Sequence, residues 1–354
     1  MLRRALLTST AVITGGLLAV TGCKGVSLNV NASSSPGAAT ASAEADPGGS
    51  TAPRHSGPMY IEPGAGFSPV YDLIDHARHS VDVTMYEFSD STAEQDLAAA
   101  SKRGVHVEVI LDHQEQSENQ GAYDYFREHG IKVVWSSPAY HYTHQKTVIV
   151  DGSEAVIMTA NLTSQYYATS RDFLAVDTSK PDVAAITAVF DADFAHRSVT
   201  PGDGSGDLVW SPTDSQRKLL DLINGARKSL RIYSEEMGDT TVEDALIDAA
   251  RRGVDVQVCG ENESGEYDSA FAKLARAGVH ISYYSSSTGF YIHGKVVEAD
   301  YGTSNAAAFI GSENFSSTSL NQNRELGLTT SSPAALSAIA SAFGGDFQHG
   351  KQWS

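Results

Sequence analysis

Cysteine and basic side chains are scarce in this chain of 354 residues. Only Cys23 and Cys259 are present, which excludes a framework of disulfides. Lys and Arg number 25 against 43 Asp and Glu, which gives a formal net charge of −18. This charge opposes sequence-independent binding of nucleic acid, which relies on basic surface, although it leaves room for a locally basic cleft. The hydrophobic fraction of 41% is enough for a core, and the length allows one large domain or two ordinary ones.

The first 23 residues have the pattern of an export signal. Arg3 and Arg4 precede an apolar run from Ala5 to Val20, which is short for a membrane-spanning helix. Small residues then lead directly to Cys23, a pattern that resembles the lipobox of bacterial lipoproteins. That resemblance implies a lipid on Cys23 and predicts residues 1–23 as a lipoprotein signal peptide. An ordinary secretory signal and a membrane-spanning helix are the alternatives. We therefore expect an exported protein, anchored by lipid to the outer face of the bacterial cell membrane or else secreted.

Residues 24–58 are rich in Ser, Ala, Gly and Pro and contain few large apolar residues. Such a composition has little to pack and predicts a flexible tether.

The rest of the chain contains an internal duplication. The stretch "YDLIDHARHSVDVTMYEFSD" from Tyr71 matches "LDLINGARKSLRIYSEEMGD" from Leu220, and the offset is 149 residues, from 72 to 221. We predict a first domain at 59–198, a linker at 199–208 and a second domain at 209–354.

Each copy alternates helical and strand patterns. In the first copy, helices are expected at 68–79, 92–103, 119–129 and 181–196, and strands at 81–86, 105–111, 131–135 and 144–151. The second copy is expected to end in a helix at 333–347. The alternation predicts an α/β fold with two duplicated domains, each a mixed, mostly parallel sheet flanked by helices.

Both copies carry the same polar pattern. "HQKTVIVD" spans 144–151, and "HGKVVEAD" spans 293–300 at the same offset. On a strand, residues two apart point to the same face, so His144 would project with Lys146 and His293 with Lys295. One such pattern arises easily by chance, but two at equivalent places in a duplicated unit indicate a function.

Further polar residues follow each pattern in the same order. A hydroxyl residue and an asparagine come first, and an acid lies eleven residues after each asparagine (161 to 172, and 314 to 325). These residues are Thr159, Asn161 and Asp172 in the first copy, and Ser312, Asn314 and Glu325 in the second.

The paired patterns resemble those of the phospholipase D superfamily, the HKD phosphodiesterases. Its pattern is HxKx4D followed by GSxN, and the resemblance covers the chain from about Tyr60 to the C-terminus. "GSEN" matches fully, whereas "MTAN" has Met158 and Thr159 in place of Gly and Ser. The resemblance implies two phospholipase D-like domains packed with pseudo-twofold symmetry around one active site in a monomer. It also implies that His144 forms a phosphohistidine, that His293 is the general acid, and that no metal or cofactor takes part.

The chemistry explains why two copies are needed. A neutral histidine can attack phosphorus, and a second, protonated one can protonate the leaving group on the opposite face. Fixed positive charge and hydrogen-bond donors can stabilise the transition state, and the two acids can fix the histidine tautomers. The predicted catalytic set is His144, Lys146, Asp151, His293, Lys295 and Asp300, with Asp151 and Asp300 in structural roles near strand ends. The predicted supporting set is Asn161, Thr159, Asn314, Ser312, Asp172 and Glu325.

Two weaker features have open interpretations. Glu87 and Glu236 repeat at strand ends, where they either line the cleft or are solvated. Aromatic residues before each histidine could bind a choline headgroup, stack on nucleobases or simply pack. They are Trp135, Tyr140, Tyr142, Tyr283, Tyr284, Phe290 and Tyr291.

We expect a phosphodiesterase of the phospholipase D type that hydrolyses or transfers phospholipid headgroups at a membrane surface. The alternatives are an endonuclease of the same superfamily, with nucleic acid as a less favoured partner, and a phosphatidyltransferase similar to cardiolipin synthase. A non-catalytic binding lipoprotein is the least favoured, because both copies keep His and Lys.

Overall fold

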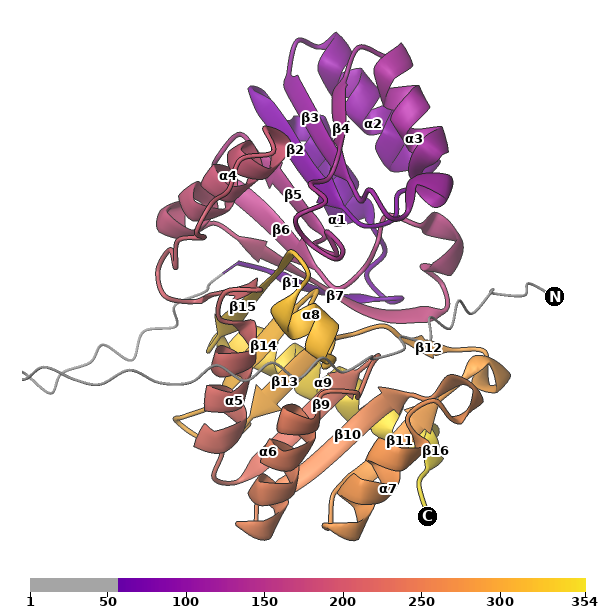
Figure 1. Cartoon of the computed structure of the whole chain (residues 1–354), viewed down its shortest axis with the longest axis vertical. Helices are drawn as coiled ribbons and strands as arrows, with labels where there is room; N and C mark the ends of the chain where they lie inside the picture. Colours follow the sequence, from indigo (N-terminus) through magenta and orange to yellow (C-terminus); the bar gives the residue numbers. More distant parts are fainter. Residues whose placement is uncertain (1–56) are drawn as a thin grey trace, which may run out of the picture. The chain divides into compact units, whose positions relative to one another are not determined.

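The computed structural model describes residues 57–354 (Figure 1). The predicted signal peptide at 1–23, its Cys23 and nearly all of the predicted tether lie outside the described residues. No helix within 57–354 combines the length and the apolar character needed to span a bilayer.

The first repeat forms a mixed sheet with the strand order β1-β7-β6-β5-β2-β3-β4. Its strands are β1 (Met59–Glu62), β2 (Ser80–Met85), β3 (His106–Leu111), β4 (Lys132–Trp135), β5 (Thr147–Val150), β6 (Glu154–Met158) and β7 (Ser170–Asp177). Its helices are α1 (Ser68–His76), α2 (Ser91–Lys102), α3 (Gln116–Glu128) and α4 (Lys180–Phe194), with a short 3₁₀ turn, η1 (Ser164–Tyr166).

The second repeat forms a sheet in the order β16-β11-β10-β9-β13-β14-β15-β8. Its strands are β8 (Leu208–Ser211), β9 (Ser229–Ser234), β10 (Asp255–Glu261), β11 (His280–Tyr284), β13 (Val296–Ala299), β14 (Ala307–Gly311), β15 (Glu325–Thr330) and β16 (Lys351–Gln352). The short strand β12 (Tyr291–Ile292) joins the first sheet instead, beside β7. The helices and 3₁₀ turns are α5 (Ser215–Gly225), α6 (Thr240–Arg251), η2 (Glu263–Gly265), α7 (Asp268–Arg276), η3 (Ser286–Thr288), α8 (Ser317–Asn321) and α9 (Pro333–His349).

The duplication extends to the helix ends. The Asp90 carboxylate accepts hydrogen bonds from the first backbone N–H groups of α2, and Asp239 does the same for α6. Gly104 and Gly253 follow these helices, each with φ of +88°, a left-handed conformation that glycine adopts at little cost. Equivalent residues therefore start and stop equivalent helices.

The α/β class and the two mixed sheets are confirmed, but the sheets are less parallel than expected. Parallel pairing is found in β2-β3-β4, in β9-β10-β11 and between β12 and β7. The remaining pairs are antiparallel, and one of them, β5 with β6, is joined by a short turn. Figure 1 shows α2 and α3 along the parallel strands of the first sheet, and α6 and α7 along those of the second.

Each repeat has a hydrophobic core of its own, and other clusters contain residues from both repeats. In one shared cluster Ile149 and Ile157 of the first sheet lie with Trp210 and Leu328 of the second. The described body is thus one structure in which the two sheets bury apolar surface together.

Candidate active site

The two histidine segments each lie against the other repeat. The backbone N–H groups of His144 and Gln145 both donate to the carbonyl of Arg324, each at 3.0 Å. In the mirrored arrangement, the N–H of His293 donates to the carbonyl of Arg171 at 3.2 Å, directly after the pairing of β12 with β7. The strands begin at Thr147 and Val296, so each His and Lys precedes the strand on which we expected them. The reason is that these segments bond across to the other repeat.

This exchange pairs each histidine with the acid of the other repeat. His144 Nδ1 lies 2.9 Å from Glu325 Oε2, and His293 Nδ1 lies 2.8 Å from Asp172 Oδ1. Because a carboxylate accepts the proton on Nδ1, Nε2 of each ring is left for chemistry. Burial lowers the pKa of His144, and Glu325 offsets part of this effect. His144 is thus suited to attack as a neutral imidazole.

Glu325 is held from its other side as well. Its Oε1 accepts hydrogen bonds from Ser319 Oγ at 2.6 Å and from Asn323 Nδ2 at 2.9 Å. The carboxyl is fully buried, which would raise its pKa, but His144 and Lys146 hold the pKa below its usual value. A charged carboxylate fixed in this way sets the orientation of the His144 ring.

The hydroxyls of Thr159 and Ser312 form hydrogen bonds within their own sheets. Thr159 Oγ1 donates to Asp172 Oδ1 at 2.6 Å and accepts from the N–H of Phe173. Ser312 Oγ accepts from the N–H of Leu326 at 3.1 Å, and both hydroxyl residues are wholly buried. These hydroxyls therefore hold the strands that carry the two acids.

The two lysines lie within one electrostatic site. Each Nζ donates to the carbonyl of the histidine two residues before it, at 2.6 Å for both Lys146 and Lys295. Burial lowers the pKa of Lys146 to about 7, Glu325 opposes this shift, and the nearby positive charge of Lys295 adds to it. Two buried cations that affect each other in this way favour the arrival of an anion.

The asparagines have unused hydrogen-bonding capacity. Asn161 Nδ2 donates to Glu87 Oε2 at 3.3 Å, while Asn161 Oδ1 and Asn314 Oδ1 have no hydrogen-bond partner. Both residues follow the strands that pair with the histidine strands. We keep them as candidates for contact with a substrate.

Asp151 and Asp300 serve the backbone. The Asp151 carboxylate accepts from the N–H groups of three consecutive residues, at 2.7–3.1 Å in its closest contacts, and Asp300 binds the equivalent turn at 2.6–3.2 Å. Asp151 also follows β5, whereas His144 precedes it, so the two residues lie at opposite ends of an extended segment. These contacts fit the structural roles expected of the two aspartates and place neither beside the histidines.

The aromatic residues of the loops largely pack. Trp135 stacks on Tyr123, Tyr140 lies over the Arg324 guanidinium, and Tyr284 OH donates to the carbonyl of Asp346. Within 57–354, Tyr166 is the one large hydrophobic residue classed as exposed, with 40% of its surface accessible. The packing interpretation is therefore favoured for these aromatics.

Sequence reasoning missed one residue of the site. Glu235 Oε2 lies 2.6 Å from Lys295 Nζ and 3.6 Å from His293 Nε2. The signal was present, because the repeat offset pairs this acid with Tyr86, an unlike residue in an otherwise matched pair of strand ends.

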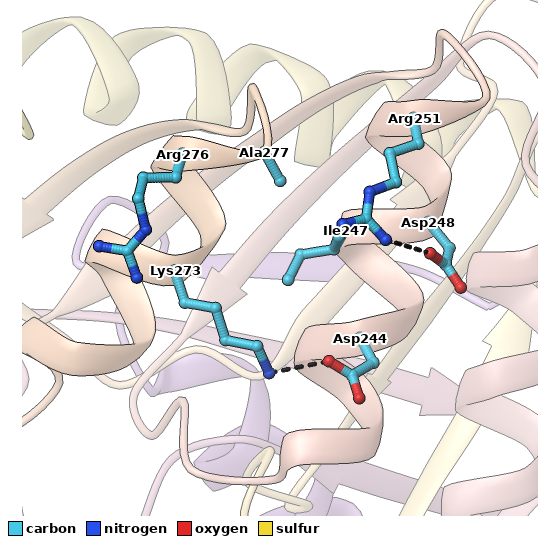
Figure 2. Close-up of a pocket in the computed structure, with 7 residues that line it drawn as sticks. All are labelled: Asp244, Ile247, Asp248, Arg251, Lys273, Arg276 and Ala277. Carbon is cyan, nitrogen blue, oxygen red and sulfur yellow. Dashed lines mark hydrogen bonds and ion pairs between the residues drawn. The ribbon is translucent and has the colours of Figure 1, made fainter.

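A surface depression elsewhere on the second repeat is not part of this site. It lies between α6 and α7 (Figure 2), where Lys273 pairs with Asp244 at 2.8 Å and Arg251 pairs with Asp248 at 3.2 Å. Exposed ion pairs of this kind contribute little to the free energy of folding. None of the predicted site residues lines the depression.

Comparison with protein families finds the duplication as two matches to one family. The family described as "Cardiolipin synthase, PLD-like domain" matches twice, at residues 70–194 and 219–347. The chain belongs to the phospholipase D superfamily. Its members are phosphodiesterases or phosphotransferases. A comparison with curated protein sequences gives no match.

Solved structures of the superfamily share the fold. The phosphatidylserine synthase of Haemophilus influenzae Rd KW20 is 12% identical with a TM-score of 0.65, over 83% of this chain and 87% of that one. The polyphosphate kinase of Porphyromonas gingivalis is 15% identical with a TM-score of 0.64, over 82% of this chain. The match covers only 50% of the kinase, so this chain corresponds to about half its length. At these identities the similarity concerns the fold alone.

Proposed function

We propose that the protein is a phosphodiesterase in which His144 attacks phosphorus and His293 protonates the leaving group. The crossed pairing carries this proposal, because each ring is tied at Nδ1 to a carboxylate of the other repeat. Two such imidazoles within one site meet the need for a nucleophile and an acid on opposite faces of a diester.

The proposed reaction has two steps. His144 Nε2 bonds to phosphorus while the bond to the leaving oxygen breaks, and the proton on His293 Nε2 passes to that oxygen. Water or an alcohol then attacks phosphorus and gives its proton to His293, and the bond to His144 breaks. Lys146 and Lys295 would supply the positive charge that the transition state needs, so we propose activity without metal or cofactor.

We propose phospholipids as the substrates. The support is electrostatic, since the net charge is −18 and carboxylates of Glu87 and Glu235 contact residues of the site. A polyanionic nucleic acid would be repelled by such surroundings, whereas a phospholipid brings a single phosphodiester with an alcohol headgroup.

Transfer to an alcohol is a second candidate. The matched family is described as cardiolipin synthase, which names a phosphatidyl transfer. The same phosphohistidine would serve both outcomes, since only the attacking oxygen differs.

The deciding experiment incubates the full-length protein in EDTA with phosphatidylcholine vesicles, and separately with single- and double-stranded DNA. Choline release without DNA cleavage supports the proposal, and DNA cleavage alone contradicts the lipid substrate. Adding glycerol distinguishes transfer, which yields phosphatidylglycerol, from hydrolysis, which yields phosphatidic acid. If the protein neither releases choline nor cleaves DNA, the result favours a non-catalytic binding protein.

We further propose that a lipid on Cys23 holds the protein at the outer face of the bacterial cell membrane, where it acts as a monomer. The support is the sequence of the first 23 residues. Replacement of Cys23 with Ser should move the protein from the membrane fraction to the soluble fraction and abolish labelling by radioactive fatty acid. Unchanged labelling would contradict the anchor.

The low pKa of Lys146 makes anion binding dependent on pH. Sulfate keeps its charge across neutral pH, so its Kd reports the charge of the site. As the pH rises above about 7, Lys146 loses its proton in the free protein, and the Kd should increase by up to about tenfold per pH unit. Calorimetric titration at several pH values measures this slope.

Lys146→Met is the matched control for that titration. It should bind sulfate weakly, with a Kd that changes little over the same pH range. A wild-type Kd that stays constant through this range would show that Lys146 does not bind the anion.

A further inference from the structure

The two halves of the site differ at one pair of equivalent positions. Tyr86 and Glu235 each follow the strand that pairs with the histidine strand of their own repeat. The Tyr86 ring lies against His144, with centroids 4.5 Å apart, and Lys146 Nζ lies 4.9 Å from its centre. The first half thus has an aromatic ring where the second half has a carboxylate.

Glu235 is fixed by three neighbours. Its Oε2 pairs with Lys295 Nζ at 2.6 Å, and its Oε1 accepts from Tyr291 OH at 2.6 Å. The same Oε2 lies 3.6 Å from His293 Nε2, the atom that must deliver a proton in the proposed reaction. Burial would raise the pKa of Glu235, but Lys295 and His293 hold it well below its usual value. Glu235 is therefore a carboxylate at neutral pH.

His293 consequently lies between two carboxylates. Asp172 is at Nδ1 and Glu235 is near Nε2, so a protonated His293 has an anionic neighbour on both sides of the ring. His144 has Glu325 at Nδ1 and the Tyr86 ring beside it. Opposite charges at this range favour the charged form of a group, and burial favours the neutral form. His293 has two such carboxylates and His144 has one.

We propose that Glu235 is a positioning residue that makes His293 the proton donor of the pair and leaves His144 as the nucleophile. This inference rests on the proposed phosphodiesterase function. It adds an explanation of how the two halves of the site differ. Glu235 itself keeps its charge throughout. In the first step the Nε2 proton of His293 goes to the leaving oxygen, and in the second step Nε2 takes a proton from the attacking water or alcohol.

The test compares leaving groups, because only a poor one needs a proton. Phosphatidylcholine loses an alkoxide, whereas phosphatidyl-p-nitrophenol loses a stable phenolate. Glu235→Gln should lower the first-turnover rate of choline release by about 100-fold, within the range of general-acid effects, and the first-turnover rate of nitrophenolate release by only a few-fold. Glu235→Asp keeps the charge and should recover part of the choline release.

Glu236→Gln is the matched control, since it removes the neighbouring acid and should affect both lipids by the same factor. A thermal melt of each variant verifies folding, and a Glu235→Gln variant that does not fold is replaced in the comparison by Glu235→Ala, which also removes the charge. Equal losses on both lipids for Glu235→Gln, or no loss, would overturn the inference.

Failure of the proposed function is a separate result. If the wild-type protein releases neither headgroup, the lipid substrate is wrong. The same comparison is then made with a dinucleotide and its p-nitrophenyl ester, and the expected selective loss on the dinucleotide is unchanged.

Discussion

Alanine at His144 or at His293 should each reduce turnover of phosphatidylcholine by about 10⁴-fold or more. The reason is that the two rings have separate tasks, and neither can act on both faces of one phosphorus atom. The variants should differ in a rapid-quench experiment with the nitrophenyl lipid. His293→Ala should accumulate a phosphorylated protein, because its first step needs no proton, while His144→Ala should form none.

His141→Ala is the matched control, since this histidine lies on the same segment but is exposed and packs on Tyr142. It should retain most of the activity. Near-normal turnover in His144→Ala would contradict the assignment of the nucleophile. A trapped phosphohistidine in that variant would mean that His293 is the nucleophile and His144 the proton donor.

Amide substitutions of the two acids should have the next largest effects. Asp172→Asn and Glu325→Gln should each lower kcat for phosphatidylcholine by about 10²-fold or more, since a ring that loses its acceptor adopts the wrong tautomer or orientation. The crossed pairing adds a specific expectation. Glu325 acts through His144, so its loss should slow the first turnover with both leaving groups. Asp172 acts through His293, so its loss should spare the first-turnover release of nitrophenolate.

The control for both variants is thermal unfolding, because Glu325 also accepts from Ser319 and Asn323 inside the core. A variant that melts near the wild-type temperature and still shows its expected pattern supports the pairing. The reverse pattern, with Asp172→Asn affecting both lipids and Glu325→Gln only phosphatidylcholine, would mean that each acid serves the histidine of its own repeat.

The sequence identified most residues of the site, but it did not predict which histidine pairs with which acid. The offset of 149 residues identified His144 with His293, and the spacing of eleven residues after each asparagine identified Asp172 with Glu325, since duplication preserves such spacings. Spacing along a chain says nothing about partners across a sheet. The exchange depends on backbone hydrogen bonds from the histidine segments to Arg324 and Arg171, and backbone groups leave no trace in residue identity.

Other differences have similar causes. Thr159 and Ser312 are hydroxyl residues at a place where a phosphate contact was plausible, but the nearest acceptors are those of their own sheets. The alternation of helices and strands predicted mostly parallel pairs. It did not predict β6, which pairs antiparallel with β5 after a short turn. Glu235 lies at a position where the two repeats have diverged, so matching residues between the repeats does not identify it.

A crystal structure with bound vanadate tests most directly whether one phosphorus atom is shared by both repeats. We expect one vanadium in the site, bonded to His144 Nε2, with its opposite apical oxygen facing His293 Nε2 and with Lys146 and Lys295 on its equatorial oxygens. Two separate vanadates, one in each repeat, or a single one bonded to His293, would contradict the account.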